Sequence, residues 1–287
     1  MSHIEEAEFV APASLDEALK LLADEKTRGT LLAGGSDLMV QWEAGVRPPP
    51  VRVISVKSVP ELRAISEEPG HVVIGAAVTH WEIRHAPLIK TFAPSLSDAC
   101  ATVGGAQIQE LGTIAGSIAN ASPAGDIAPS LLVADASVVV ASARGEREMP
   151  LIQFMKGYKN IDLQPDEMIV RFRVPKLPAG GREAWRKLGP RAAQAISKVM
   201  GSYRGRMKDG VIESFAVALG SVGPTAIRIP AVESHVAGKA PSPQLFAEAE
   251  RIASDFVQPI SDIRSTAEYR KWVSGRIVRM FLEDLAG

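Results

Sequence analysis

The sequence predicts an α+β protein made of two small mixed units followed by a unit of antiparallel sheet and helices. Three kinds of signal support this fold class: capping motifs of the form Ser/Thr-x-x-Glu, short β-branched runs between turn formers, and one Asp-Gly step between two apolar runs. With 287 residues, of which 46% are hydrophobic, the chain is long enough for two or three compact units.

The first unit, residues 1–56, is expected to begin with a helix, because Ser14 to Glu17 has the capping-box form and apolar residues follow at helical spacing. A strand then leads into a glycine turn and a second helix. The expected elements are a helix from Leu15 to Leu22, a strand over 30–33, a turn over 34–37, a helix through Trp42 and, after the proline run 48–50, a strand over 51–56.

The second unit, residues 57–176, alternates strands and short helices. Thr79 to Glu82 repeats the capping-box form, and Gly104-Gly105 ends another helix. The expected elements are strands over 71–75, 136–141 and 168–174, with helices from Thr79 and over 94–103.

The third unit, residues 177–287, follows a run of Pro and Gly between 175 and 181. Asp209-Gly210 predicts a hairpin between two apolar runs. Ser265 to Glu268 forms a third capping box, and a helix is expected to follow with a core-facing stripe of Tyr269, Val273, Ile277, Met280, Phe281 and Leu285.

Composition excludes several classes of protein. Lys and Arg total 32 against 33 Asp and Glu, a net charge of -1, so neither nucleic acid nor anionic lipid is an expected partner. Cys100 is the sole cysteine, so this chain alone forms no disulfide and holds no thiolate-ligated iron–sulfur cluster. The acidic amino terminus and the lack of long apolar runs predict a cytoplasmic protein without membrane insertion.

Two segments consist almost wholly of small residues, which lets a phosphorylated ligand approach the backbone. In the first, Gly34 and Gly35 permit unusual backbone angles, Ser36 adds a hydroxyl, and the helix after Asp37 adds a positive dipole. Taken singly, each glycine also fits a plain turn, cap or bulge.

The second segment runs from Thr113 to Asp126. Gly116 and Ser117 could present amides, and Thr113, Asn120 and Ser122 offer polar groups, while Asp126 would accept from a sugar hydroxyl. Neither G-x-G-x-x-G nor G-x-x-x-x-G-K-[ST] occurs, so a nicotinamide-type fold and a phosphate loop lose support.

Taken together, these residues resemble the FAD-binding, or medium, subunits of the molybdenum hydroxylases. The resemblance spans the chain and is carried by Phe9 to Leu19, Ala33-Gly-Gly-Ser-Asp-Leu38, Gly104-x-x-Gln107, Gly112 to Asp126, Pro165-Asp-Glu-Met-Ile169, Lys187-Leu-Gly-Pro-Arg191, Ile196-Ser-Lys-Val199 and Asp262 to Arg270. It implies a two-lobed FAD-binding fold of the vanillyl-alcohol-oxidase (PCMH) type, with non-covalent FAD between the lobes. A C-terminal domain of the carbon monoxide dehydrogenase flavoprotein type follows.

The resemblance also implies the site. Lys187 would lie by the flavin, where a cation stabilises the negative charge of the reduced ring. The implied cofactor-binding residues are Leu32, Ala33, Gly34, Gly35, Ser36, Asp37, Leu38, Val103, Gly104, Thr113, Gly116, Ser117, Asn120, Ser122, Asp126, Ile169 and Lys187.

The function implied is electron transfer. Electrons would pass from 2Fe-2S clusters on a partner to FAD and then to NAD, a quinone or dioxygen, while a third subunit with molybdopterin oxidises an N-heterocycle, purine, aldehyde or CO. A dimer of heterotrimers is the expected assembly, and the substrate stays open. The alternatives are a free-standing FAD oxidoreductase and a non-catalytic nucleotide-binding module.

Some residues depart from the family pattern or stay outside the site. Thr113-Ile-Ala-Gly-Ser117 stands where Thr-Ile-Gly-Gly-Asn is commoner, so Ala115 adds a methyl and Ser117 a hydroxyl in place of an amide. Ala192-Ala193 replaces a second arginine found in many relatives. His80 is expected to cap a helix, and Cys100 to be a buried, inert thiol with no covalent link to FAD.

Overall fold

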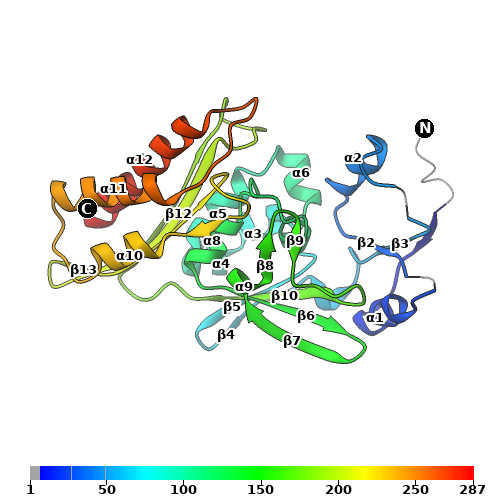
Figure 1. The fold of residues 1–287 in the computed structure, drawn as a ribbon. Helices are drawn as coiled ribbons and strands as arrows, with labels where there is room; N and C mark the ends of the chain where they lie inside the picture. The colour runs from blue at the N-terminus through cyan, green and yellow to red at the C-terminus, as the bar shows by residue number, and fades with distance from the viewer. Residues whose placement is uncertain (1–6, 27, 49) are drawn as a thin grey trace.

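The computed structural model describes residues 7–26, 28–48 and 50–287. Residues 1–6 of the acidic amino terminus and Pro49 of the proline run lie outside the described residues. Three units follow one another across the molecule, from the first at the right of Figure 1 to the helices of the third at the left. We propose that the units divide near residues 56 and 176, because each has a sheet of its own.

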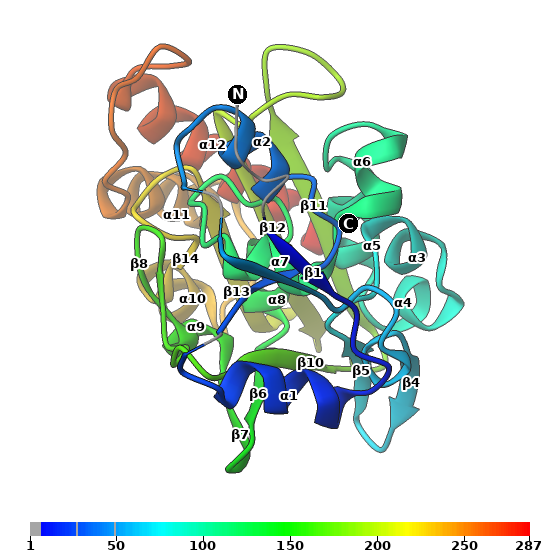
Figure 2. The same ribbon diagram turned by 90° about the vertical axis from the view of Figure 1, so that its right-hand side faces the viewer.

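The first unit is a three-stranded parallel sheet in the order β1-β3-β2. Figure 2 shows this sheet with α1 below it and α2 above it. The Ser14 hydroxyl accepts from the Glu17 amide as predicted, but the Glu17 carboxylate accepts from Ala13 and not from Ser14. The elements are β1 (Glu8–Val10), α1 (Leu15–Ala23), β2 (Thr30–Leu32), α2 (Leu38–Glu43) and β3 (Arg52–Ser55), which confirms every predicted element and adds β1.

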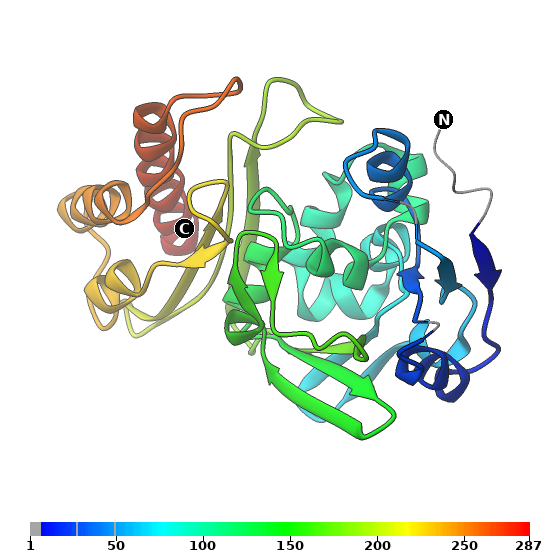
Figure 3. The same ribbon diagram turned by 45° about the vertical axis from the view of Figure 1, so that its right-hand side comes forward.

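The second unit is a five-stranded antiparallel sheet, β4-β5-β10-β6-β7, with short helices on one side (Figure 3). The capping box at Thr79 and Glu82 is confirmed, with both of its hydrogen bonds present. The elements are η2 (Pro60–Leu62), β4 (Ile65–Glu68), β5 (His71–Gly75), α3 (His80–His85), α4 (Pro87–Phe92), α5 (Pro94–Ala101), α6 (Ala106–Leu111), α7 (Ile114–Ala119), α8 (Ala128–Val133), β6 (Ser137–Ser142), β7 (Gly145–Pro150), α9 (Leu151–Phe154), β8 (Met155–Gly157), β9 (Asn160–Ile161) and β10 (Met168–Pro175).

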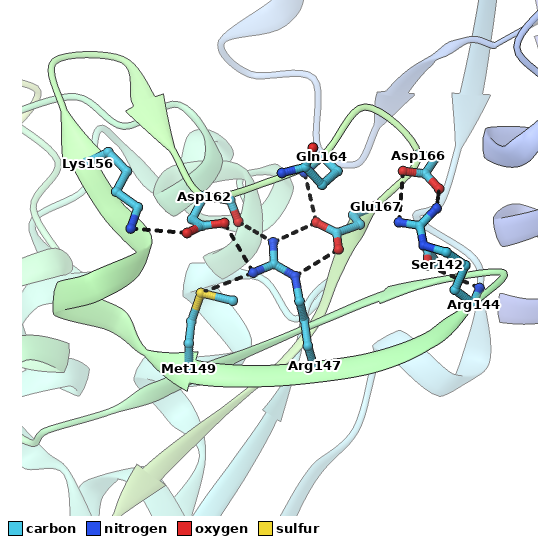
Figure 4. A network of polar contacts seen from close by, with 9 residues as sticks. All are labelled: Ser142, Arg144, Arg147, Met149, Lys156, Asp162, Gln164, Asp166 and Glu167. Carbon is cyan, nitrogen blue, oxygen red and sulfur yellow. Dashed lines mark hydrogen bonds and ion pairs between the residues drawn. The ribbon is translucent and has the colours of Figure 1, made fainter.

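A polar network around Arg147 fixes the β8–β9 hairpin against β7 (Figure 4). The Arg147 guanidinium pairs with Glu167 at 2.7 Å and with Asp162 at 3.1 Å, and Lys156 also pairs with Asp162. The hairpin held in this way reaches the second small-residue segment, where the Lys159 amide donates to the carbonyl of residue 121.

The third unit is a four-stranded antiparallel sheet, β11-β12-β13-β14, packed between α5 and α8 on one face and its own helices on the other (Figure 1). The predicted hairpin is confirmed, since Asp209 and Gly210 both have positive φ between β12 and β13. The elements are β11 (Gly181–Leu188), β12 (Val199–Lys208), β13 (Val211–Gly220), β14 (Ile227–Arg228), α10 (Pro230–Val236), α11 (Pro243–Phe256) and α12 (Ala267–Ala286).

Two details of α12 differ from the prediction. Its cap is Thr266, whose hydroxyl accepts from Tyr269, because the Ser265 amide is held instead in a turn by Asp262. Of the expected stripe, Tyr269 and Met280 are exposed. The sheet and α11 cover only one side of this helix, so only the other four positions reach the core.

A buried ion pair within the third unit makes hydrogen bonds to the second unit. Glu183 on β11 has no exposed side-chain surface; it pairs with Arg204 and accepts from the amide and hydroxyl of Ser95. Arg204 also donates to the Pro175 carbonyl at 2.8 Å. These bonds tie the third sheet to α5.

In the described part of the chain, no helix combines the length and apolar character needed to cross a membrane.

Candidate functional site

The first small-residue segment contacts the chain immediately before the second one, at Leu111 and Gly112. A Cβ atom on Gly34 would lie 1.7 Å from the carbonyl oxygen of Leu111, and one on Gly112 would lie 3.3 Å from Oγ of Ser36. Only glycine allows the backbone of residue 34 to pass so close to that carbonyl. The sequence predicted both segments but not this contact.

The first segment presents unused amides. Within the residues that the structure describes, the amides of residues 34–37 donate to no acceptor. Gly35 has a φ of 71°, which lets the chain turn between β2 and α2, and Leu38 begins the helix. A cluster of neighbouring N–H groups without acceptors is the arrangement that binds a phosphate oxygen. The residues present therefore fit a diphosphate.

The second segment is organised differently, because its first part is helix α7. The Thr113 hydroxyl accepts from the Gly116 amide at 3.1 Å, and the Thr113 carbonyl accepts from the Ser117 amide at 3.0 Å. These two amides are therefore already used within the chain. What the segment offers a ligand is the Ser117 hydroxyl and, beyond α7, the Asn120 side chain. Contacts of Gly116 and Ser117 with a cofactor stay a prediction.

The end of the second segment lies between the second and third units. The Pro123 carbonyl accepts from the Ser221 amide at 2.8 Å, and a Cβ on Gly220 would lie 3.2 Å from the same carbonyl oxygen. The Ser122 hydroxyl accepts from the Ala124 amide. Close packing between units is thus a second physical reason for small side chains here.

Lys187 and Asp126, which the sequence predicted in separate roles, form one buried ion pair. Their Nζ and Oδ2 atoms are 2.6 Å apart, and each side chain keeps only 11% of its surface exposed. Lys187 also donates to the Thr102 carbonyl at 2.9 Å, and Ser197 donates to the other Asp126 oxygen at 3.0 Å. Burial raises the pKa of Asp126, although Lys187 acts in the opposite direction.

The turn before α6 connects this pair to residues 34–37, which we call the glycine corner. Val103 and Gly104 follow the Thr102 carbonyl, and Gly104 has a φ of 50° as it enters the turn. Helix α6 then runs to Leu111, which contacts Gly34. The loop 189–198 reaches this turn from the third unit. A Cβ on Gly105 would lie 3.1 Å from the side-chain nitrogen, Nε2, of Gln194 in that loop.

The remaining predicted residues fall into two places. Leu32, Ala33 and Leu38 flank the glycine turn, whereas Ile169 is 5% exposed and lies on β10 opposite Val140. Its contact with a cofactor stays a prediction. Ser197 was missed, although it stands in the Ile196-Ser-Lys-Val199 stretch, because a lone serine carries no signal of the carboxylate that it contacts.

His80 is not a helix cap, which corrects the prediction. Thr79 fills that position, and His80 occupies the first helical residue with 2% of its surface exposed. Burial lowers the pKa of His80 to about 4. Its Nδ1 lies 3.6 Å from Sγ of Cys100, whose own pKa is raised by burial, so the prediction of a buried thiol is confirmed.

A surface hollow of about 280 Å³ lies away from these residues, lined mainly by apolar side chains that include Ile152 and Phe256. The charged residue in its wall, Arg228, is paired with Glu233 and Asp135. Its charged group is therefore engaged, and the glycine corner with the Lys187–Asp126 pair is the better candidate site.

Comparison with known proteins gives consistent matches. Residues 5–177 match the family described as the FAD binding domain in molybdopterin dehydrogenase, and residues 184–285 match the CO dehydrogenase flavoprotein C-terminal domain. The chain is 30% identical to the carbon monoxide dehydrogenase medium chain of Hydrogenophaga pseudoflava, over 96% of this chain and 95% of that one. It is 31% identical to the nicotinate dehydrogenase FAD-subunit of Eubacterium barkeri, over 97% and 96%.

Among solved structures, the carbon monoxide dehydrogenase from Hydrogenophaga pseudoflava that lacks the Mo-pyranopterin moiety superposes with a TM-score of 0.92. The identity is 30%, over 96% of this chain and 95% of that chain.

Proposed function

The chain belongs to the family of FAD-binding medium subunits of the molybdenum hydroxylases, and from that premise we propose that it passes electrons from partner iron–sulfur clusters to an external acceptor. It carries an FAD-binding domain and is an oxidoreductase subunit. Molybdopterin and 2Fe-2S clusters belong, in this proposal, to an iron–sulfur subunit and a molybdenum subunit. The proposed assembly is a dimer of heterotrimers, with NAD, a quinone or dioxygen as the acceptor.

The observation that carries the cofactor assignment is the glycine corner. The amides of residues 34–37 lack acceptors in the described part of the chain and stand beside the Gly34–Leu111 contact. We propose that they hold the FAD diphosphate, because several neighbouring N–H groups without acceptors match its charge without bulky side chains. The proposed contacts beyond this corner are those that the resemblance implies.

Bound FAD would supply the ability to take up and release electrons, and the protein supplies binding and electrostatics. The Lys187 ammonium donates to the Thr102 carbonyl and to the Asp126 carboxylate. We propose that this ammonium stabilises negative charge on the cofactor. Ser197, in loop 189–198 of the third unit, donates to the Asp126 carboxylate and so holds it beside Lys187.

Relatives named for oxidation of carbon monoxide and of nicotinate match this chain about equally well. The substrate is therefore a property of the molybdenum subunit in this proposal, and flavoproteins of one family serve several chemistries.

A tagged form of the chain, purified from its own host under native conditions, tests the proposal. Mass spectrometry of the co-purifying chains, with analysis of FAD, iron and molybdenum, should find an iron–sulfur partner, a molybdenum partner and all three cofactors. A yellow protein that purifies alone, without iron or molybdenum, would contradict this function and identify a free-standing FAD oxidoreductase.

A further inference from the structure

The positive charge of Lys187 is balanced within the protein by the carboxylate of Asp126. Their 2.6 Å contact is buried on both sides, with 11% of each side chain exposed. In such a site charges interact more strongly than in water. The two groups therefore act on their surroundings as a pair and not as two independent charges.

The carboxylate is held in place by more than its partner. Ser197 donates to Oδ1 at 3.0 Å, so each carboxylate oxygen has a donor, and the Lys187 ammonium also donates to the Thr102 carbonyl at 2.9 Å. These contacts come from four separate segments: the end of the second small-residue segment, the turn before α6, strand β11 and the loop 189–198. Asp126 cannot turn away from Lys187 without also losing the hydrogen bond from Ser197.

Pairing changes what a nearby cofactor experiences. An isolated ammonium favours the added negative charge of a reduced flavin, whereas an ammonium next to a carboxylate has a field that falls off much faster with distance. A buried pair is also weak grounds for extra stability. Folding stability therefore does not explain the pair, and its position in the candidate site indicates a functional role.

We propose that Asp126 is a positioning residue that offsets the charge of Lys187 and thereby keeps the reduction potential of the bound flavin low. This inference rests on the proposed function, because it takes FAD to lie beside Lys187. Burial raises the pKa of Asp126 while Lys187 opposes that change, which agrees with two groups that depend on each other.

Redox titration of the bound flavin against a reference dye tests the proposal with four proteins: wild type, Asp126→Asn, Lys187→Met and the double variant. The net charge of the pair is zero in the wild type and in the double variant, positive in Asp126→Asn and negative in Lys187→Met. Asp126→Asn should favour reduced flavin at least tenfold, about 30 mV for a two-electron couple. Lys187→Met should shift in the opposite direction, and the double variant should return toward the wild type.

Asp16→Asn is the matched control, because it makes the same substitution in an exposed ion pair with Lys20 on α1, away from the site. Its potential should stay close to that of the wild type. An Asp126→Asn potential equal to or below the wild-type value would overturn the proposal.

If Asp126→Asn cannot be purified with flavin, the potential of the double variant tests the proposal instead, because that variant buries no unpaired charge. A double variant with the potential of Lys187→Met would overturn the proposal, and a return toward the wild-type value supports it. A wild-type protein that takes up no FAD would instead refute the proposed function, and this inference with it.

Discussion

Gly34 and Leu111 approach so closely that a methyl group on the glycine would lie 1.7 Å from the leucine carbonyl oxygen. This contact joins the turn after β2 to the end of α6, and so joins the first unit to the second. The unused amides of residues 34–37 start at this point. The contact therefore fixes the position of the segment that carries those amides.

Gly34→Ala should separate the two segments, because no neighbouring side chain can yield when the obstacle is backbone. We expect FAD affinity to fall at least tenfold, and the unfolding free energy to fall by about 1–3 kcal/mol. Gly157→Ala is the control, since nothing lies within 4 Å of a Cβ there. Flavin fluorescence titration measures the affinity, and equal affinities for the two variants would remove Gly34 from the site.

Lys187→Met should make the flavin harder to reduce, because it removes the cation proposed to stabilise the reduced ring. The expected shift is roughly 30 mV or more, which is about 1.4 kcal/mol for a two-electron couple. Lys20→Met, on the exposed face of α1, changes the net charge equally without touching the site. Identical shifts for the two variants would mean that overall charge, and not the position of Lys187, sets the potential.

Glu183→Gln should destabilise the junction between the second and third units. It leaves the Arg204 guanidinium, 12% exposed, without its carboxylate, and loss of one partner of a buried pair costs about 3–5 kcal/mol. Glu146→Gln breaks the exposed pair with Arg171 and should cost less than about 1 kcal/mol. Urea unfolding compares the two, and similar losses would show that the Glu183 pair does not hold the units together.

Stability should fall as the pH drops below 6.5, because burial lowers the pKa of His80 to about 4 from an ordinary value of 6.5. Between these values the unfolded chain binds a proton that the folded chain excludes. From pH 7.5 to 5.5 this one group should remove about 1.4 kcal/mol of unfolding free energy.

His80→Gln should lose that part of the pH dependence, while the exposed His85→Gln should keep it because His80 is still present. Unfolding free energies measured at both pH values check this. If His80→Gln retains the wild-type slope, the buried imidazole is not its source.

Much of the fold could be predicted from local signals. The helix starts at Ser14 and Thr79 and the Asp209-Gly210 hairpin depend on side chains that bond their own neighbouring backbone, so a short stretch of sequence contains the whole cause. Strand β1, with only three residues, has no such signal. The cap of α12 moved from Ser265 to Thr266 because Asp262, outside the capping motif, holds the Ser265 amide.

The sequence predicts a set of candidate site residues, but not how the chain brings them together. The glycines predict that a ligand or another segment approaches the backbone closely. At Gly34 the nearest group is the carbonyl of Leu111, which is far away in sequence. Likewise, nothing local pairs Asp126 with Lys187, because only the packing of the third sheet against the second unit brings them together. Contacts of this kind depend on the tertiary structure and leave no pattern in a short window.

The central claim is that the amides of the glycine corner bind the diphosphate of FAD, and a crystal structure of the chain with FAD tests it most directly. The account predicts diphosphate oxygens within about 3.2 Å of amide nitrogens in residues 34–37, with the flavin ring near Lys187. A structure with FAD bound elsewhere and this corner free of phosphate would contradict it.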